Sequence, residues 1–95
     1  KVIKMSTGVL RGNAISLPQP VYPIIAKQIK LQGAVSVQIL IDELGNVVSA
    51  EAVDGHPILV PEARKAALRA RFTPTKLSGV PVKVSGVIVY KFGIN

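Results

Sequence analysis

The sequence predicts an α+β fold: two helices packed on one face of a three-stranded antiparallel sheet, in the order helix, strand, strand, helix, strand. Within residues 35–42 every second side chain is β-branched and apolar, at 35, 37, 39 and 41, and positions 36 and 38 are polar, as in a strand. Residues 23–31 and 58–71 instead space their apolar side chains as helices do. Since 95 residues make one small domain, we expect a single domain with a lead-in segment over residues 1–20 and a core over residues 21–95.

For the lead-in segment, the sequence predicts a short N-terminal hairpin or an extended stretch. Its apolar runs flank Arg11, Gly12 and Asn13, and glycine and asparagine tolerate the positive φ angles of a tight turn. Prolines at 18, 20 and 23 then force the backbone into an extended path.

The first helix is expected over residues 23–31, with Pro23 in its first turn. Apolar residues at helical spacing predict one buried face, formed by Val21, Ile24, Ile25 and Ile29. Gly33 is expected to cap the C-terminal end.

A strand and its hairpin partner are expected next. Val35, Val37, Ile39 and Ile41 point to one face of the first strand. Gly45 and Asn46 suit a tight turn after it. Residues 47–53 return as the second strand.

The second helix is expected over residues 58–71, closed by Phe72 and stopped by Pro74. Its inward residues are mostly small, which allows close approach to a sheet: Leu59, Ala63, Ala66, Ala67 and Ala70. A loop precedes the last strand, expected over residues 82–92. Its two faces carry Val82, Val84, Ile88, Tyr90 and Phe92 on one side, and Lys83, Ser85, Val87, Val89 and Lys91 on the other.

The net charge of +7 suits an anionic partner or surface, and it also serves solubility alone. The second helix concentrates basic side chains, namely Arg64, Lys65, Arg69 and Arg71, which could contact phosphates. No strand rich in aromatic residues accompanies them, as single-strand binders usually need. We therefore expect no nucleic-acid partner.

The sequence offers no catalytic set, and we predict that the chain is not an enzyme and binds no cofactor. His56 is the sole histidine, and no serine in a nucleophile context stands with it and Asp54. Cysteine is absent, which removes thiolate chemistry and cysteine-based zinc sites, so we expect no metal site. His56 is expected to pack or to cap a helix start, and Asp42 to bond its own turn.

No apolar run approaches the roughly 20 residues of a membrane span. The sequence begins at Lys1 rather than at a methionine. We expect a domain cut from a longer protein, with any targeting or anchoring segment upstream.

Several short motifs, in order and at fitting spacing, resemble the TonB C-terminal domain family over nearly the whole chain. They are "QPVYP" (residues 19–23), the pattern of Ala26, Gln32, Gly33, Val35, Val37, Ile41, Asp42, Gly45 and Val47, "GHPIL" (55–59), "RFTP" (71–74) and "LSGVPVKV" (77–84). The chain departs from the family at Ala70, where many members place a tryptophan, which alters packing more than function.

The resemblance implies a periplasmic domain, joined by a proline-rich linker to one inner-membrane helix. That upstream helix would associate with the ExbB–ExbD proton channel. The domain would grip the TonB box, a short peptide of an outer-membrane transporter, and pass on force derived from the proton gradient for nutrient uptake.

The resemblance also implies that the peptide pairs as an added strand on the edge formed by the last strand. The expected partner-binding residues are Gln19, Pro20, Val21, Tyr22, Val82, Lys83, Val84, Ser85, Val87, Val89 and Lys91. A homodimer formed through the same edge is an alternative that the sequence leaves undecided. So is a different client of the same fold, such as a signalling or cell-wall partner.

Overall fold

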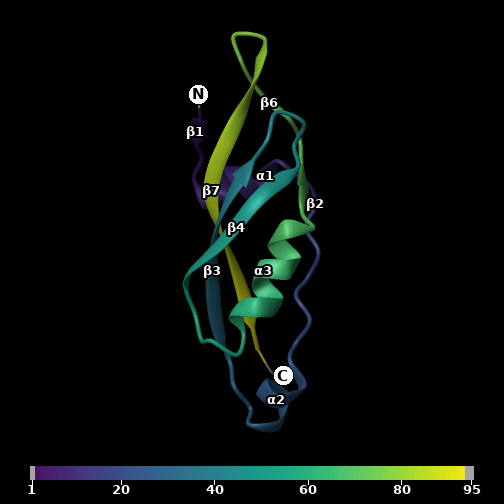
Figure 1. Cartoon of the computed structure of the whole chain (residues 1–95), viewed down its shortest axis with the longest axis vertical. Coiled ribbons are helices and arrows are strands. Elements are labelled where there is room, and N and C mark those ends of the chain that lie inside the picture. The colour runs from purple at the N-terminus through teal and green to yellow at the C-terminus, as the bar shows by residue number, and fades with distance from the viewer. Residues whose placement is uncertain (1, 94–95) are drawn as a thin grey trace.

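The computed structural model describes residues 2–93, which form three helices and seven strands (Figure 1). In chain order the elements are β1 (Val2–Lys4), α1 (Thr7–Gly12), β2 (Ala14–Ser16), α2 (Ile24–Gln28), β3 (Gly33–Ile41), β4 (Val47–Asp54), α3 (Val60–Leu68), β5 (Arg71–Phe72), β6 (Thr75–Leu77) and β7 (Val80–Phe92). The molecule is elongated, 50 × 21 × 19 Å, with the β6–β7 turn at one end and α2 at the other.

The main sheet has five strands in the order β1-β7-β3-β4, with β6 also paired to β7. β7 pairs antiparallel with β3, from Val84 opposite Ile41 to Phe92 opposite Gly33. On its other side it pairs with β6 and, in parallel, with β1. The α+β class is confirmed, but the three-strand count is wrong because β1 and β6 both add to the last strand. β2 and β5 form a separate two-stranded sheet.

The core lies on one face of the main sheet, as the alternation predicted. Its buried side chains include Val35, Val37, Ile39, Ile41, Val84, Ile88, Tyr90 and Phe92 from the strands and Leu59, Ala63, Ala66, Ala67 and Ala70 from α3 and its ends. α1 lies on the same face, because its buried Leu10 packs over Gly86, where a Cβ would lie 2.9 Å from the leucine Cδ2. Helices α1 and α3 therefore share the core face.

The lead-in segment contains a helix where a hairpin or extended stretch was predicted, so that prediction is wrong for residues 7–12. The side chain of Ser6 accepts a hydrogen bond from the Val9 N–H and thereby caps the start of α1. Asn13 ends the helix, and β2 then pairs with β5 rather than folding back on its neighbour.

Helix α2 is shorter than predicted, and its buried face is a different one. Ala26 is its buried residue, whereas Ile24, Ile25 and Ile29 are 73%, 60% and 60% exposed. In this helix of five residues only one side chain is buried in the core. Gly33 is not its cap but the first residue of β3, and Lys30, at φ 57°, takes the left-handed conformation instead.

The segment after α3 also differs from the prediction. α3 ends at Leu68, so Phe72 lies in β5 rather than in the helix. The predicted loop before the last strand contains β6, joined to β7 by a tight turn at Ser78 and Gly79. Both turn residues have positive φ, which matches the right-handed twist of a hairpin.

Candidate partner-binding site

The outward edge of β7 is the part of the fold that was predicted to bind a peptide. Carbonyl groups of Ser85, Val87 and Val89 point outward, since each accepts a hydrogen bond from the lead-in segment. Backbone groups alternate along a strand, so the N–H groups of these residues and the backbone groups of Lys91 face the same way. The backbone N–H and carbonyl groups of the even-numbered residues of β7 face β3.

Half of this predicted edge is already paired, which corrects the expectation that the last strand is an open edge throughout. β6 pairs from Thr75 opposite Val82 to Leu77 opposite Val80. β1 pairs with Lys83, Val84 and Ser85, and the Met5 N–H donates to the Ser85 carbonyl at 2.9 Å. Among residues 2–93, no strand pairs with the outward side of β7 beyond Ser85.

Two side chains of α1 reach the remaining edge. The Thr7 hydroxyl donates a hydrogen bond to the Val87 carbonyl at 2.9 Å, and the Arg11 guanidinium donates to the Val89 carbonyl. Neither contact has a local signal in the sequence, because 80 and 78 residues separate the partners along the chain. Both residues are additions to the predicted site.

The "QPVYP" segment lies beside the far end of this edge. The ring of Tyr22 contacts that of Phe92 edge to face, and its hydroxyl donates to the Leu31 carbonyl. Gln19 lines a cavity of about 170 Å³ together with Val89 and other residues of the edge. The structure therefore brings Gln19 and Tyr22 to the open part of β7 and leaves Val82, Lys83, Val84 and Ser85 outside it.

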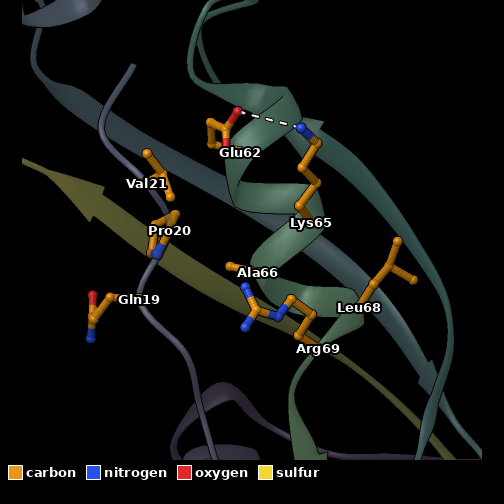
Figure 2. Close-up of a pocket in the computed structure, with 8 residues that line it drawn as sticks. All are labelled: Gln19, Pro20, Val21, Glu62, Lys65, Ala66, Leu68 and Arg69. Carbon is orange, nitrogen blue, oxygen red and sulfur yellow. Dashed lines mark ion pairs between the residues drawn. The ribbon is translucent and has the colours of Figure 1, made fainter. Parts of the chain in front are cut away.

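A second hollow, of about 460 Å³, separates Gln19, Pro20 and Val21 from α3 (Figure 2). Arg69 extends from α3 toward this segment, whereas Lys65 turns to Glu62, at 3.6 Å between Nζ and Oε2. Pro20 and Val21 thus belong to a groove on the helix side rather than to the strand edge.

The basic residues of the α3 region do not form one free stripe. Arg64 donates from Nε to the Ala50 carbonyl of β4 at 2.9 Å, and Arg71 donates to the Ala70 carbonyl. Lys65 is in the ion pair with Glu62. Contacts within the domain therefore orient these three side chains.

His56 and Asp42 each accept hydrogen bonds from nearby backbone N–H groups. His56 is exposed, and its Nδ1 accepts the Ile58 N–H just before α3. Asp42 Oδ1 accepts the N–H groups of Leu44 and Asn46 within its own turn, as predicted. Residues 2–93 contain no cluster of three or more histidine, cysteine or acidic side chains that could hold a metal ion, and no helix in that range is long and apolar enough to cross a membrane.

Comparison with known proteins agrees with this architecture. The family model described as the Gram-negative bacterial TonB protein C-terminal matches residues 18–94. The solution NMR structure of the Pseudomonas aeruginosa TonB C-terminal domain is similar, with a TM-score of 0.66 and 25% sequence identity over 86% of this chain and 85% of that one. A comparison with curated proteins found no match. From its family-model match and its fold, the chain belongs to the TonB C-terminal domain family.

Proposed function

We propose that this domain is the periplasmic binding module of a TonB-like energy transducer, and that it grips the TonB box of an outer-membrane transporter by strand addition to β7. Membership of the TonB C-terminal family supports a transducer role and an interaction with transporters rather than catalysis. Upstream parts of the protein would supply the inner-membrane anchor and the contact with ExbB–ExbD.

The observation that carries this proposal is the open stretch of β7 beyond Ser85. Its inner side is fully paired with β3, which fixes the extended backbone, and its outer side offers backbone donors and acceptors at Val87, Val89 and Lys91. An extended peptide of about five residues would match that length. Main-chain hydrogen bonds then supply affinity, and side chains supply register.

The lead-in segment limits where the peptide binds. Because β1 already pairs with Lys83, Val84 and Ser85, the peptide can pair only with residues 87–92 of β7 unless β1 separates from the sheet. It must also replace the side-chain donors of Thr7 and Arg11 on the Val87 and Val89 carbonyls. The binding edge is therefore short and lies next to Gln19 and Tyr22.

The direct test is an N-methyl scan of a synthetic TonB-box peptide titrated into the 95-residue chain, followed by amide chemical shifts in NMR. Strand addition predicts that methylation abolishes binding at every second peptide residue, where the N–H faces β7, and is tolerated between them. Shift changes should gather on Val87, Val89, Lys91, Gln19 and Tyr22. A scan without this alternation, or shifts confined to α3, would contradict strand addition.

A matched pair of protein variants tests the same edge. Val89→Pro removes a backbone N–H that faces outward. The ladder between β7 and β3 therefore keeps its hydrogen bonds, while one carbonyl of the bound peptide loses its donor. Val89→Ala removes side-chain area but keeps that donor. We expect the proline variant to lose at least about tenfold in affinity and the alanine variant about threefold or less. Circular dichroism checks that both remain folded.

A further inference from the structure

Helix α2 and the residues beside it present an exposed apolar surface at one end of the long axis of the molecule (Figure 1). This surface, which we call the α2 tip, is formed by Val21, Ile24, Ile25, Lys27, Ile29 and Lys30. Its apolar side chains are between 60% and 73% exposed. Single exposed apolar residues are common on proteins, but several gathered in one patch mark a site of interaction.

The fold holds the apolar side chains of the α2 tip outward. Ala26 is fully buried, which places the opposite side of α2 against the core. The Leu31 N–H donates to the Ala26 carbonyl at 2.8 Å, and the Tyr22 hydroxyl donates to the Leu31 carbonyl. Ile25 and Ile29 are one turn apart, so they share one face of the helix. That face cannot turn inward unless these contacts break.

The charge of the α2 tip has one sign. Residues 1–41 contain no aspartate or glutamate, and the 5 acidic residues of the chain all lie within residues 42–62. Lys27 and Lys30 therefore stand among apolar side chains without an acidic neighbour in this part of the sequence. An apolar surface that carries uncompensated ammonium groups is complementary to a partner with anionic groups at its surface and an apolar interior beneath them.

The shape and composition of the α2 tip favour a bilayer over a folded protein as this partner. The tip protrudes at the end of an elongated molecule, and the hollows beside Gln19 are lined by residues outside α2. The strongest contacts between proteins usually come from tryptophan, tyrosine and arginine side chains that fill pockets. The tip carries aliphatic side chains and lysines instead. A bilayer accepts such side chains anywhere on its surface, without a matching pocket.

We propose that the α2 tip docks on a phospholipid bilayer with anionic headgroups. The isoleucines reach the boundary between headgroups and acyl chains, and the lysines extend their stems along it and place their ammonium groups at the phosphates. The apolar area is too small to bind firmly without the charge, so docking is reversible and weakens with salt. The inference does not depend on strand addition, because the tip contains no residue of β7.

The experiment measures binding of the 95-residue chain to vesicles by co-sedimentation at fixed salt. One set of vesicles contains phosphatidylglycerol and phosphatidylcholine in equal parts, and the other contains phosphatidylcholine alone. We expect binding to the anionic vesicles to be at least about tenfold tighter, since each lysine near such a surface contributes about fivefold.

Tryptophan, which the sequence lacks, reports whether the tip enters the bilayer. Ile24→Trp and Leu44→Trp form a matched pair, because Ile24 is 73% exposed and Leu44, in the β3–β4 turn beside Glu43, is 75% exposed. With anionic vesicles, the emission of the Ile24→Trp protein should shift to shorter wavelength and be quenched by lipids with brominated acyl chains. The emission of the Leu44→Trp protein should stay as it is in water.

A pair of double variants tests the apolar contribution. Ile24→Ser with Ile25→Ser should weaken binding to anionic vesicles at least about tenfold. Val48→Ser with Val53→Ser is the control, because these side chains of β4 are also exposed, at 53% and 57%. It should leave binding unchanged. Circular dichroism checks that both proteins are folded.

A second pair tests the charge. Lys27→Gln with Lys30→Gln should weaken binding at least about tenfold. Lys76→Gln with Lys83→Gln removes the same charge from exposed positions on β6 and β7, and it should change binding by less than about threefold.

The outcomes separate this inference from the proposed function. If anionic vesicles do not bind while a TonB-box peptide still shifts residues 87–92, lipid docking is wrong and strand addition stands. If vesicles bind as expected but no peptide shifts β7, lipid docking stands and strand addition fails.

Two further outcomes would overturn lipid docking. If the variant at Lys76 and Lys83 loses as much binding as the variant at Lys27 and Lys30, net charge explains the attraction. If the parent self-associates without lipid and the double serine variant of α2 abolishes this, the tip binds a second copy of the chain instead.

Discussion

The aromatic rings of Tyr22 and Phe92 meet edge to face, with centroids 5.5 Å apart and planes at 83°. This contact joins the proline-rich segment to the last residue of β7, and the Tyr22 hydroxyl adds a hydrogen bond to the Leu31 carbonyl. The end of the proposed binding edge is thereby held by two separate interactions.

Replacing Tyr22 tests how much each interaction contributes. Tyr22→Phe keeps the ring pair and loses the hydrogen bond, so we expect a loss of about 1 kcal/mol in the free energy of unfolding. Tyr22→Ala loses both, and about 2–4 kcal/mol, since edge-to-face pairs add to the area buried. Urea denaturation measures both values. Equal losses in the two variants would show that the ring contact contributes nothing.

Glycine substitutions at two turns distinguish backbone strain from collision. Gly45 and Gly79 both have positive φ, at 90° and 79°. A Cβ at Gly45 would lie 1.9 Å from the Phe72 carbonyl oxygen, whereas a Cβ at Gly79 has nothing within 4 Å. Gly79→Ala should cost about 1–2 kcal/mol from conformation alone. Gly45→Ala should cost clearly more and disturb the bond from the Phe72 N–H to the Gly45 carbonyl, and thermal unfolding ranks the two.

Tyr90 predicts a pH dependence of stability. Burial raises its pKa above the ordinary 10.0, with the charge of Arg11 opposing the rise, so above about pH 10 the unfolded chain loses this proton before the folded one does. Stability is then fully present below that pH and falls as the pH rises through the folded-state pKa.

Tyr90→Phe isolates this contribution, because lysines titrate equally in both proteins. The stability of the variant minus that of the parent should grow as the pH rises above about 10, the ordinary pKa of tyrosine. At pH 7 the variant should be as stable as the parent or slightly more so, since the lost hydroxyl has no recorded partner. A constant difference across this range would contradict the assignment.

The open stretch of β7 and the outer strand β4 are each contacted by an arginine, which predicts a protection against self-association. Arg11 donates to the Val89 carbonyl on the β7 side, and Arg64 donates to the Ala50 carbonyl of β4. Exposed strand edges tend to pair with other chains. The double variant Arg11→Met with Arg64→Met should therefore dimerise at lower concentration than the parent in analytical ultracentrifugation. The control variant Lys27→Met with Lys30→Met removes the same charge at the exposed α2 end. It should stay monomeric if exposed strand edges, rather than net charge, cause the dimerisation.

The core could be predicted from the sequence because alternation and helical spacing are local signals. Val35 to Ile41 and the alanines of α3 were placed correctly for this reason. The isoleucines of α2 were misplaced, because spacing alone does not tell whether a helix this short has a surface to bury against. Ser78 and Gly79 did carry a turn signal, which could have revealed β6.

The occupied edge could not be predicted. β1 pairs with β7 across some 80 residues of sequence, in parallel, and three residues of "VIK" resemble many other segments. The contacts of Thr7 and Arg11 depend on where α1 lies over Gly86, which no local pattern encodes. The predicted site therefore did not include Thr7 and Arg11, whose side chains contact the outward side of β7.

The unbroken pairing of β7 with β3 has a mechanical consequence. A tension directed along β7 acts parallel to the whole ladder, so the hydrogen bonds between Val84 opposite Ile41 and Phe92 opposite Gly33 bear the load together. A tension directed across the sheet would instead open them one after another, beginning at an end. The parallel loading also holds for the hydrogen bonds between β7 and a peptide that is aligned with it and pulled lengthwise. Bonds loaded together in this way withstand far more force than the same bonds opened one after another.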